Sequence, residues 1–288
     1  MSERVAVKKT YKLYIGGKFP RSESGYTMPV VSGSGEHLAH VAQASRKDAR
    51  DAIVAARGAH SGWAGATAYN RGQVLYRIAE MLEGRREQFV EEIRQGESVS
   101  ARVANQQVDQ AIDAWVWYAG WSDKHAQVVG GANPVAGPFF NLSVPEPSGV
   151  VVAFAPQDAK GQSLLGLVHT IAPIIVTGNA VVVLSHPSQP LPAMSFAEVL
   201  HTSDVPGGVV NILTGERASI APWVASHADV NALDLMGAGE LDWASLEEAA
   251  AQTLKRVYTP VKGVPAVSLE RISAFTEVKT IWHTKALG

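Results

Sequence analysis

Residues 149–184 read GVVVAFAPQDAKGQSLLGLVHTIAPIIVTGNAVVVL, and this stretch decides the fold. Two apolar runs, 150–154 and 180–184, flank a segment long enough for a helix. Comparable runs follow at 209–213 (VVNIL), 231–235 (NALDL) and 255–258 (KRVY). Short apolar strands that alternate with helical segments are typical of a parallel sheet covered on both faces. The sequence therefore predicts an α/β fold with a doubly wound, Rossmann-like parallel sheet of about five strands.

The residues before this sheet are predicted to be mainly helical. After a short strand over 11–19 and a loop rich in Pro, Ser and Gly, Ser45 and Asp48 form a plausible capping pair for a helix. The apolar residues of 70–93 recur at helical spacing and predict one continuous helix. A third helix is expected over 101–124, with its tryptophans packed in the core.

A different pattern follows at 135–149, VAGPFFNLSVPEPSG. Phe140, Leu142 and Val144 alternate with polar residues until Pro145 and Pro147 end the run, which predicts an edge strand with a turn. The chain finishes on a second alternating stretch, 276–282, TEVKTIW. These two segments predict a small antiparallel sheet outside the parallel one.

Composition excludes several classes of function. The 288 residues carry a formal net charge of −2 with no basic block, so the sequence predicts no nucleic-acid partner. The N-terminus lacks the apolar run of a signal peptide, and no stretch approaches the roughly 18 apolar residues of a membrane span. A cytoplasmic protein without a membrane partner is expected.

Ligands of doubly wound sheets lie at the carboxyl ends of the strands, so the residues there are the candidates for chemistry. In chain order they are Gln157, Asp158 and Lys160, then Ser185 and His186, then Thr214 and Gly215, then Gly237 and Gly239. The last pair is an incomplete dinucleotide fingerprint, because Asp242 stands where the third glycine would be. The sequence has no cysteine, no apparent Ser-His-acid triad and no metal-ligand spacing among its nine histidines, so no catalytic or metal-binding residue is predicted.

A set of motifs resembles the aldehyde dehydrogenase superfamily in order and spacing. They are YIGGKF, DARDAIVAARGAHSGWA, VDQAIDAWVWYAGWSDK, VPEPSGVVVAFAP, TGNAVVVL and GGVVNILTG with ASHADV. The resemblance runs from Tyr11 to Val257 and resumes at Ile272 to Trp282. It implies a Rossmann-like domain that binds NAD or NADP, a catalytic domain with a nucleophilic cysteine, and a sheet that ties subunits together.

The resemblance passes from the last Rossmann strand to the terminal strand across about a dozen residues, which implies that the catalytic domain is absent. The chain is then similar to the degenerate second module of tandem aldehyde dehydrogenases. The expected division is a helical part of the Rossmann-like domain at 1–134, an oligomerisation hairpin at 135–148, the remainder of the Rossmann-like domain at 149–262, and an oligomerisation strand at 270–288.

The family positions that would hold cofactor and substrate have changed. Gln157 and Asp158 replace the tryptophan and asparagine of the family's PWN motif, and Leu184 replaces the lysine that grips the adenosine ribose. Ala238 replaces a serine, Arg217 a glycine and Pro260 the general-base glutamate. Gly215 and Gly237 are the other two family cleft positions, and the cleft as a whole is expected to be degenerate. Arg217 is expected to crowd a pyrophosphate. No cofactor is expected, although residual NAD(P) binding stays open.

These changes predict a non-catalytic subunit that assembles with, and stabilises or regulates, a full-length aldehyde dehydrogenase. Residues 276–282 are expected to pair with 139–144 in the same chain, leaving the outer edge of that sheet for the partner or for self-association. The predicted oligomerisation residues are Phe140, Leu142, Val144, Val278, Thr280 and Trp282. The alternatives are a nucleotide or small-molecule sensor that uses the Rossmann-like crevice, a weak oxidoreductase active only in complex, and a residual activity of Asp158, Lys160 or His186.

Overall fold

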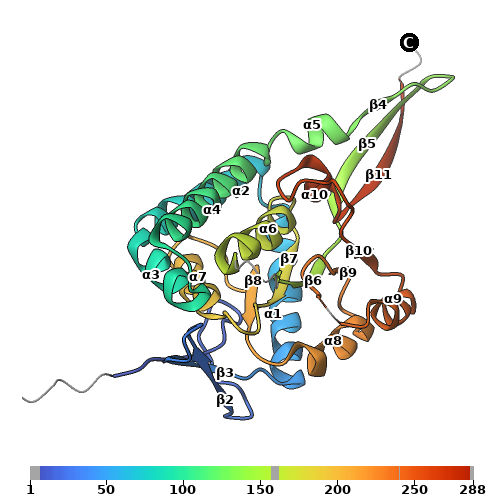
Figure 1. Cartoon of the computed structure of the whole chain (residues 1–288). Coiled ribbons are helices and arrows are strands. Elements are labelled where there is room, and N and C mark those ends of the chain that lie inside the picture. Colours follow the sequence, from blue (N-terminus) through green and yellow to red (C-terminus); the bar gives the residue numbers. More distant parts are fainter. Residues whose placement is uncertain (1–6, 157–161, 240, 286–288) are drawn as a thin grey trace, which may run out of the picture.

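A five-stranded parallel sheet forms the centre of the molecule (Figure 1). The computed structural model describes residues 7–156, 162–239 and 241–285. The sheet has the order β10-β9-β6-β7-β8. Its strands are β6 (Val150–Phe154), β7 (Ala180–Leu184), β8 (Val210–Leu213), β9 (Ala232–Asp234) and β10 (Arg256–Tyr258). Each lies within a predicted apolar run, so the doubly wound α/β fold is confirmed.

Helices cover both faces of this sheet because alternate residues of each strand face opposite sides. In β6, Val151 and Ala153 join one apolar cluster, whereas Val152 and Phe154 join another. The first cluster includes residues of α2 (Ala68–Glu83), α3 (Arg86–Glu97), α4 (Ala101–Trp121), α6 (Ser163–Ile175) and α7 (Leu191–His201). The second includes residues of α1 (Arg46–Gly65), α8 (Arg217–Ser226) and α9 (Trp243–Ala251). The two-sided core explains why the strands read as continuous apolar runs.

The first residues of the helices are predicted more accurately than their last residues. Ser45 and Asp48 form the capping box of α1, as expected. The single helix predicted over 70–93 is wrong, because the chain turns at Gly84 and Arg85 and forms α2 and α3. The apolar repeat continues through this turn, since Leu82 and Phe89 on either side enter the same core. Periodicity therefore could not reveal the break. Helix α4 ends at Trp121, three residues earlier than predicted.

The N-terminal residues form a second, small sheet. Its strands are β1 (Thr10–Tyr11), β2 (Thr27–Val31) and β3 (His37–Ala42), in the order β1-β3-β2. The strand predicted over 11–19 is therefore mostly wrong: Gly16 and Gly17 have positive φ and turn the chain there. The predicted loop after it contains both β2 and β3, which the Pro and Gly residues around them concealed.

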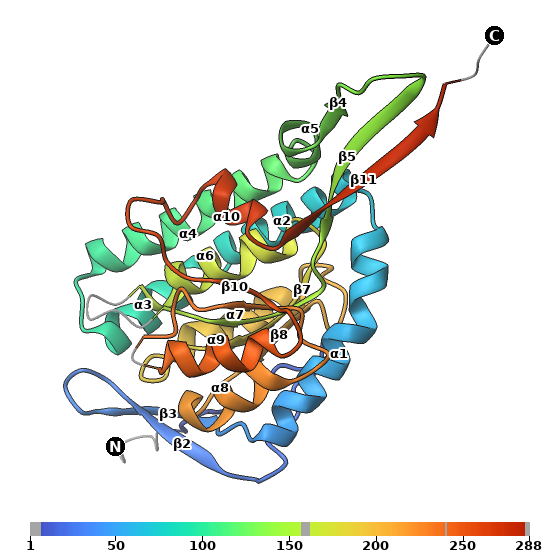
Figure 2. The same ribbon diagram turned by 90° about the vertical axis from the view of Figure 1, so that its right-hand side faces the viewer.

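A third sheet projects from the body of the molecule (Figures 1 and 2). It consists of β4 (Gly131–Asn133), β5 (Phe139–Pro147) and β11 (Thr276–Thr284), in the order β11-β5-β4. The predicted antiparallel pairing of the two segments is confirmed and its register is continuous, with 276–282 opposite 141–147 and not 139–144. Strand β5 is central rather than an edge strand, and it runs through both prolines. These prolines lie where β4, which pairs only with 141–143, no longer covers the other side of β5.

A short connection joins β10 to the C-terminal part. Residues 259–268 contain no helix or strand, and α10 (Leu269–Ser273) follows them directly. Between β10 and β11 the chain therefore has no room for a further α/β domain, which agrees with the predicted absence of the catalytic domain. Helix α5 (His125–Val129) links α4 to the projecting sheet. Among the described residues no helix combines the length and apolar character needed to cross a bilayer. The domain boundaries and the cytoplasmic location stay predictions.

Candidate functional site

The carboxyl ends of β6, β7 and β9 form what is here named the strand-end site. Strands β7 and β8 lie on one side of β6 and β9 and β10 on the other, so the strand order reverses between β6 and β9. This is the place where ligands bind in doubly wound sheets. The turn after β9 packs directly against the end of β6, since a Cβ on Gly237 would lie 2.1 Å from the carbonyl oxygen of Phe154. Only glycine fits there.

The side chain of Arg217, the first residue of α8, lies at the centre of the strand-end site. Its Nε and Nη2 donate to the Ser185 carbonyl oxygen at 3.0 and 2.6 Å. Nη2 also donates to the carbonyl oxygens of Ala155 (2.6 Å) and Leu184 (3.2 Å), and Nη1 to that of Gly237 (2.9 Å). Because these acceptors lie at the ends of β7, β6 and β9, one guanidinium group joins three strands.

Arg217 is a buried cation that has no acidic partner among the described residues. It is 4% exposed, and no carboxylate of the described residues lies within ion-pair distance of it. Burial lowers the pKa of Arg217 to about 10, so the group stays protonated at neutral pH. The four carbonyl dipoles stabilise this charge in place of a carboxylate, which makes Arg217 a structural cross-link of the site.

His186 lies next to this cross-link and has a structural role as well. Its Nδ1 accepts hydrogen bonds from the backbone N–H groups of Ser188 (3.2 Å) and Gln189 (3.0 Å), which shapes the turn before α7. Burial, with a smaller contribution from the charge of Arg217, lowers the pKa of His186 to about 4. A neutral imidazole whose acceptor nitrogen is already bonded does not have the geometry of a general base.

A carboxylate occupies the N-terminus of α6. Glu97, the last residue of α3, accepts hydrogen bonds from the backbone N–H groups of Gln162 (3.1 Å) and Ser163 (2.8 Å) and from the Ser163 hydroxyl (2.5 Å). Gln107 Oε1 accepts from the next N–H group, that of Leu164, at 3.1 Å. Helix N-termini attract anions, and here the anion is a side chain of the same protein. No local pattern predicts this contact, because Glu97 and Ser163 are 66 residues apart.

The predicted cleft residues fall into two groups. Gln157 and Asp158, like Lys160, lie outside the described residues. Leu184, Gly215, Gly237 and Ala238 all lie at strand ends, where they are buried. The side chains of Leu184 and Ala238 belong to the apolar cluster beneath α1, α8 and α9 and offer no polar atom to a ligand. Asp242, read from the sequence as the break in a glycine fingerprint, is the N-cap of α9 and accepts from the Ser245 N–H.

One described carboxyl group with a pKa raised to near neutrality, that of Glu92, lies away from the strand-end site. Glu92 on α3 accepts hydrogen bonds from the Ser195 hydroxyl (2.6 Å) and Gln88 Nε2 (3.0 Å), and its Oε2 is buried without a partner among the described residues. Burial raises the pKa of Glu92 from 4.5 to about 7. The group packs α3 against α7 rather than facing the ends of the parallel strands.

Glu92 makes stability depend on pH. Because its folded pKa lies above its unfolded value, the folded state binds more protons, and the free energy of unfolding should fall as pH rises from about 4.5 to 7. Glu92→Gln should therefore be more stable than the wild type at pH 8, by up to about 3 kcal/mol, and equal to it near pH 4. Urea unfolding of both proteins across this range measures the difference. If the free energies of unfolding of the two proteins changed with pH in the same way, burial would not raise the pKa of Glu92.

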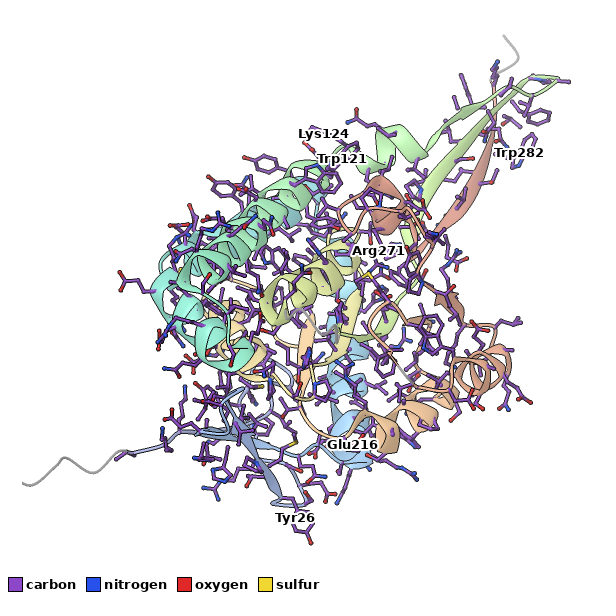
Figure 3. The ribbon with its side chains drawn as sticks, viewed as in Figure 1. Tyr26, Trp121, Lys124, Glu216, Arg271 and Trp282 are labelled. Atoms are coloured by element: carbon purple, nitrogen blue, oxygen red, sulfur yellow. The ribbon has the colours of Figure 1, made fainter. Side chains whose placement is uncertain are left out.

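The predicted oligomerisation residues all lie on the projecting sheet, but on two faces. Opposed residues share a face, and the register pairs Leu142 with Ile281 and Asn141 with Trp282. Phe140, Leu142 and Val144 therefore lie on one face, and Val278, Thr280 and Trp282 on the other. Phe140, Val278 and Trp282 are 57%, 60% and 58% exposed. Figure 3 shows Trp282 on the projecting sheet, far from the buried Arg271. Among the described residues no cluster of three or more His, Asp or Glu is arranged to hold a metal.

The fold and the strand-end site define a protein of the Rossmann-like α/β class with a projecting antiparallel sheet. The model of the aldehyde dehydrogenase family matches residues 19–267, and the chain belongs to this family. The cytosolic aldehyde dehydrogenase 1 of Elephantulus edwardii is 33% identical over 252 residues, which cover 85% of this chain and 49% of that protein. Mouse cytosolic 10-formyltetrahydrofolate dehydrogenase is 28% identical over 91% of this chain and 29% of its own length.

Solved structures have the same fold. HpcC from Thermus thermophilus superposes with a TM-score of 0.78 at 26% identity, over 86% of this chain and 47% of that chain. A Staphylococcus aureus betaine aldehyde dehydrogenase in complex with NAD+ has the same TM-score at 23% identity, over 86% and 48% of the two chains. The chain thus spans about half the length of the first relatives that it matches.

Proposed function

We propose that this chain is a non-catalytic aldehyde dehydrogenase-like subunit that assembles with a full-length NAD(P)-dependent aldehyde dehydrogenase and stabilises or regulates it. The observation that carries the proposal is the free outer edge of β11. Strand β11 is nine residues long and pairs with β5 on one side. It has no neighbouring strand on the other side among the described residues. Unpaired edges of this length are templates for adding a strand from another chain.

The backbone groups of this edge can be assigned. The Lys285 N–H donates to the Pro138 carbonyl, and the Phe275 carbonyl accepts from the Ser148 N–H. Because bonded and non-bonded pairs alternate in an antiparallel ladder, the odd-numbered residues of β11 bond to β5. The even-numbered residues, among them Val278, Thr280 and Trp282, direct their N–H and C=O groups toward the free edge.

The side chains of the projecting sheet also favour a partner. Phe140 and Leu142 are exposed on one face, and Val278 and Trp282 on the other, so both faces keep apolar side chains that the described residues leave exposed. An isolated three-stranded sheet with apolar residues on both faces would gain stability by burying them, at about 25 cal/mol for each Å2 removed from water. A family member that retains its full length is a natural partner, because it would supply the domain that this chain lacks.

The chain lacks the groups for aldehyde oxidation that the family resemblance implies. Its 288 residues include no cysteine, and Pro260 stands at the position of the general base. A weak oxidoreductase activity in complex with a partner is the alternative. It would require groups from the partner, because this chain has no cysteine and the Nδ1 acceptor of His186 is already bonded.

The proposal is tested by co-expression with full-length aldehyde dehydrogenases encoded near this gene, followed by affinity purification and size-exclusion chromatography with light scattering. The expected result is a complex of defined mass that contains both chains, and a dehydrogenase whose thermal stability or activity changes when this chain is present. A monodisperse monomer that leaves every such enzyme unchanged would refute the proposal. A homo-oligomer that buries β11 would replace it with self-association.

A further inference from the structure

We infer that the strand-end site of this chain is filled by its own side chains, Arg217 at the strand ends and Glu97 at the N-terminus of α6, and does not accept a dinucleotide. The family binds its cofactor with the Rossmann-like domain, and solved relatives contain NAD+. The residues of this chain do not fit that ligand. The inference concerns the strand-end site alone and is independent of the partner proposed for the projecting sheet.

The first reason is the position of Arg217. A dinucleotide at a doubly wound sheet places its pyrophosphate close to backbone at the strand ends, where glycines leave space. Here that space holds a guanidinium group that is 4% exposed and makes five hydrogen bonds to four carbonyl oxygens. Only one of its five N–H groups is left without an acceptor. A ligand at this position would have to break most of these bonds and move the start of α8.

The second reason is the charge at α6. A helix N-terminus binds a phosphate through its free N–H groups and its dipole. The N–H groups of Gln162 and Ser163 are already bonded to the carboxylate of Glu97, and that of Leu164 to Gln107. A phosphate brought to this helix would meet a negative charge instead of free donors. Glu97 therefore takes the place that an anionic ligand would need.

The third reason is that two of the described cleft residues offer no polar contact to a nucleoside. Leu184 ends β7 and Ala238 follows β9, and both side chains are 2% exposed within an apolar cluster. Neither has a group that can bond to a ribose hydroxyl. Leu184 and Ala238 thus supply no donor that would compensate for displacing Arg217. It follows that the body of this chain is held together at the strand ends without a cofactor, so its assembly with a partner should not depend on NAD bound by this chain.

Isothermal titration calorimetry of the isolated chain with NAD+ and with AMP tests the inference. The wild type should show no saturable binding below about 10 mM, whereas Arg217→Ala, which removes the cross-link, should bind at least about tenfold more tightly than the wild type. Arg50→Ala, in which an exposed arginine paired with Asp51 is removed, is the matched control and should behave as the wild type. Wild-type binding with a Kd below about 10 mM would overturn the inference. So would a folded Arg217→Ala protein that binds no better than the wild type.

A measurement on the wild type covers the case in which Arg217→Ala does not fold. The Nε–H of Arg217 should give a slowly exchanging NMR signal, assigned by its loss in Arg217→Lys, because the group is buried and bonded to the Ser185 carbonyl. Adding NAD+ to about 10 mM should leave this signal unshifted. A saturable shift of the Arg217 signal with NAD+ would show that the cofactor reaches the site and would overturn the inference.

Discussion

Replacing Thr280 by proline is expected to weaken assembly with a full-length aldehyde dehydrogenase by about a hundredfold and to leave the isolated chain folded. Thr280 is an even-numbered residue of β11, so its N–H points toward the free edge and not toward β5. Proline removes that donor and places its ring where a partner strand would approach. An interface hydrogen bond left unmade costs about 1–3 kcal/mol, and about 1.4 kcal/mol corresponds to a tenfold change in affinity.

Two matched variants separate loss of the edge from loss of the sheet. Thr280→Val keeps the backbone donor and should assemble like the wild type. Lys279→Pro removes a donor that faces β5, so it should destabilise the chain itself, which circular dichroism and thermal melting will show. Assembly is measured by light scattering and by surface plasmon resonance with an immobilised partner. Equal affinities for Thr280→Pro and Thr280→Val would mean that the partner does not add a strand to β11.

The sequence predicts an element well when its residue pattern is compatible with only one kind of structure. Strands β6 and β7 are buried on both faces, and their five-residue apolar runs match the observed bounds without error. The break between α2 and α3 is different, because both helices bury the same stripe against one core and the apolar repeat does not change at Gly84. The strands β2 and β3 lie among Pro, Ser and Gly residues that are as common in loops as in edge strands.

The strand-end site could be located from the sequence, but its contents could not. Gly215 and Gly237 each come two residues after the end of a predicted strand, which is sufficient to place them at the carboxyl ends. The contacts of Glu97 with Ser163, and of Arg217 with Ala155, join residues 66 and 62 positions apart. Such contacts depend on how helices pack across the sheet, and no spacing within one segment encodes that. The alternation of β5 and β11 likewise predicts their pairing, whereas only the register shows that Leu142 and Trp282 lie on opposite faces.

The second large effect is expected at the buried ion pair between Asp234 and Arg271. Arg271 Nη2 donates to Asp234 Oδ2 at 2.6 Å, and the two side chains are 1% and 0% exposed. The guanidinium also lies 4.4 Å from the ring centre of Tyr258. Asp234 ends β9 and Arg271 lies in α10, directly before Phe275 and β11. The pair therefore fixes the base of the projecting sheet to the parallel sheet, at the point where the chain makes its short connection from β10.

Asp234→Asn should lower the free energy of unfolding by about 3–5 kcal/mol, because it leaves the charge of Arg271 buried without a counter-ion. The double variant Asp234→Asn with Arg271→Met removes both charges and should recover most of this loss, since an apolar side chain tolerates burial beside Tyr258 and Phe275. Glu277→Gln is the matched control: it breaks the exposed pair of Arg256 with Glu277, 41% and 62% exposed, and should cost less than about 1 kcal/mol. Urea unfolding at pH 7 measures all three. Two results would show that the ion pair does not hold the base of the projecting sheet. One is that Asp234→Asn lowers the free energy of unfolding by no more than Glu277→Gln does. The other is that the double variant is less stable than Asp234→Asn alone.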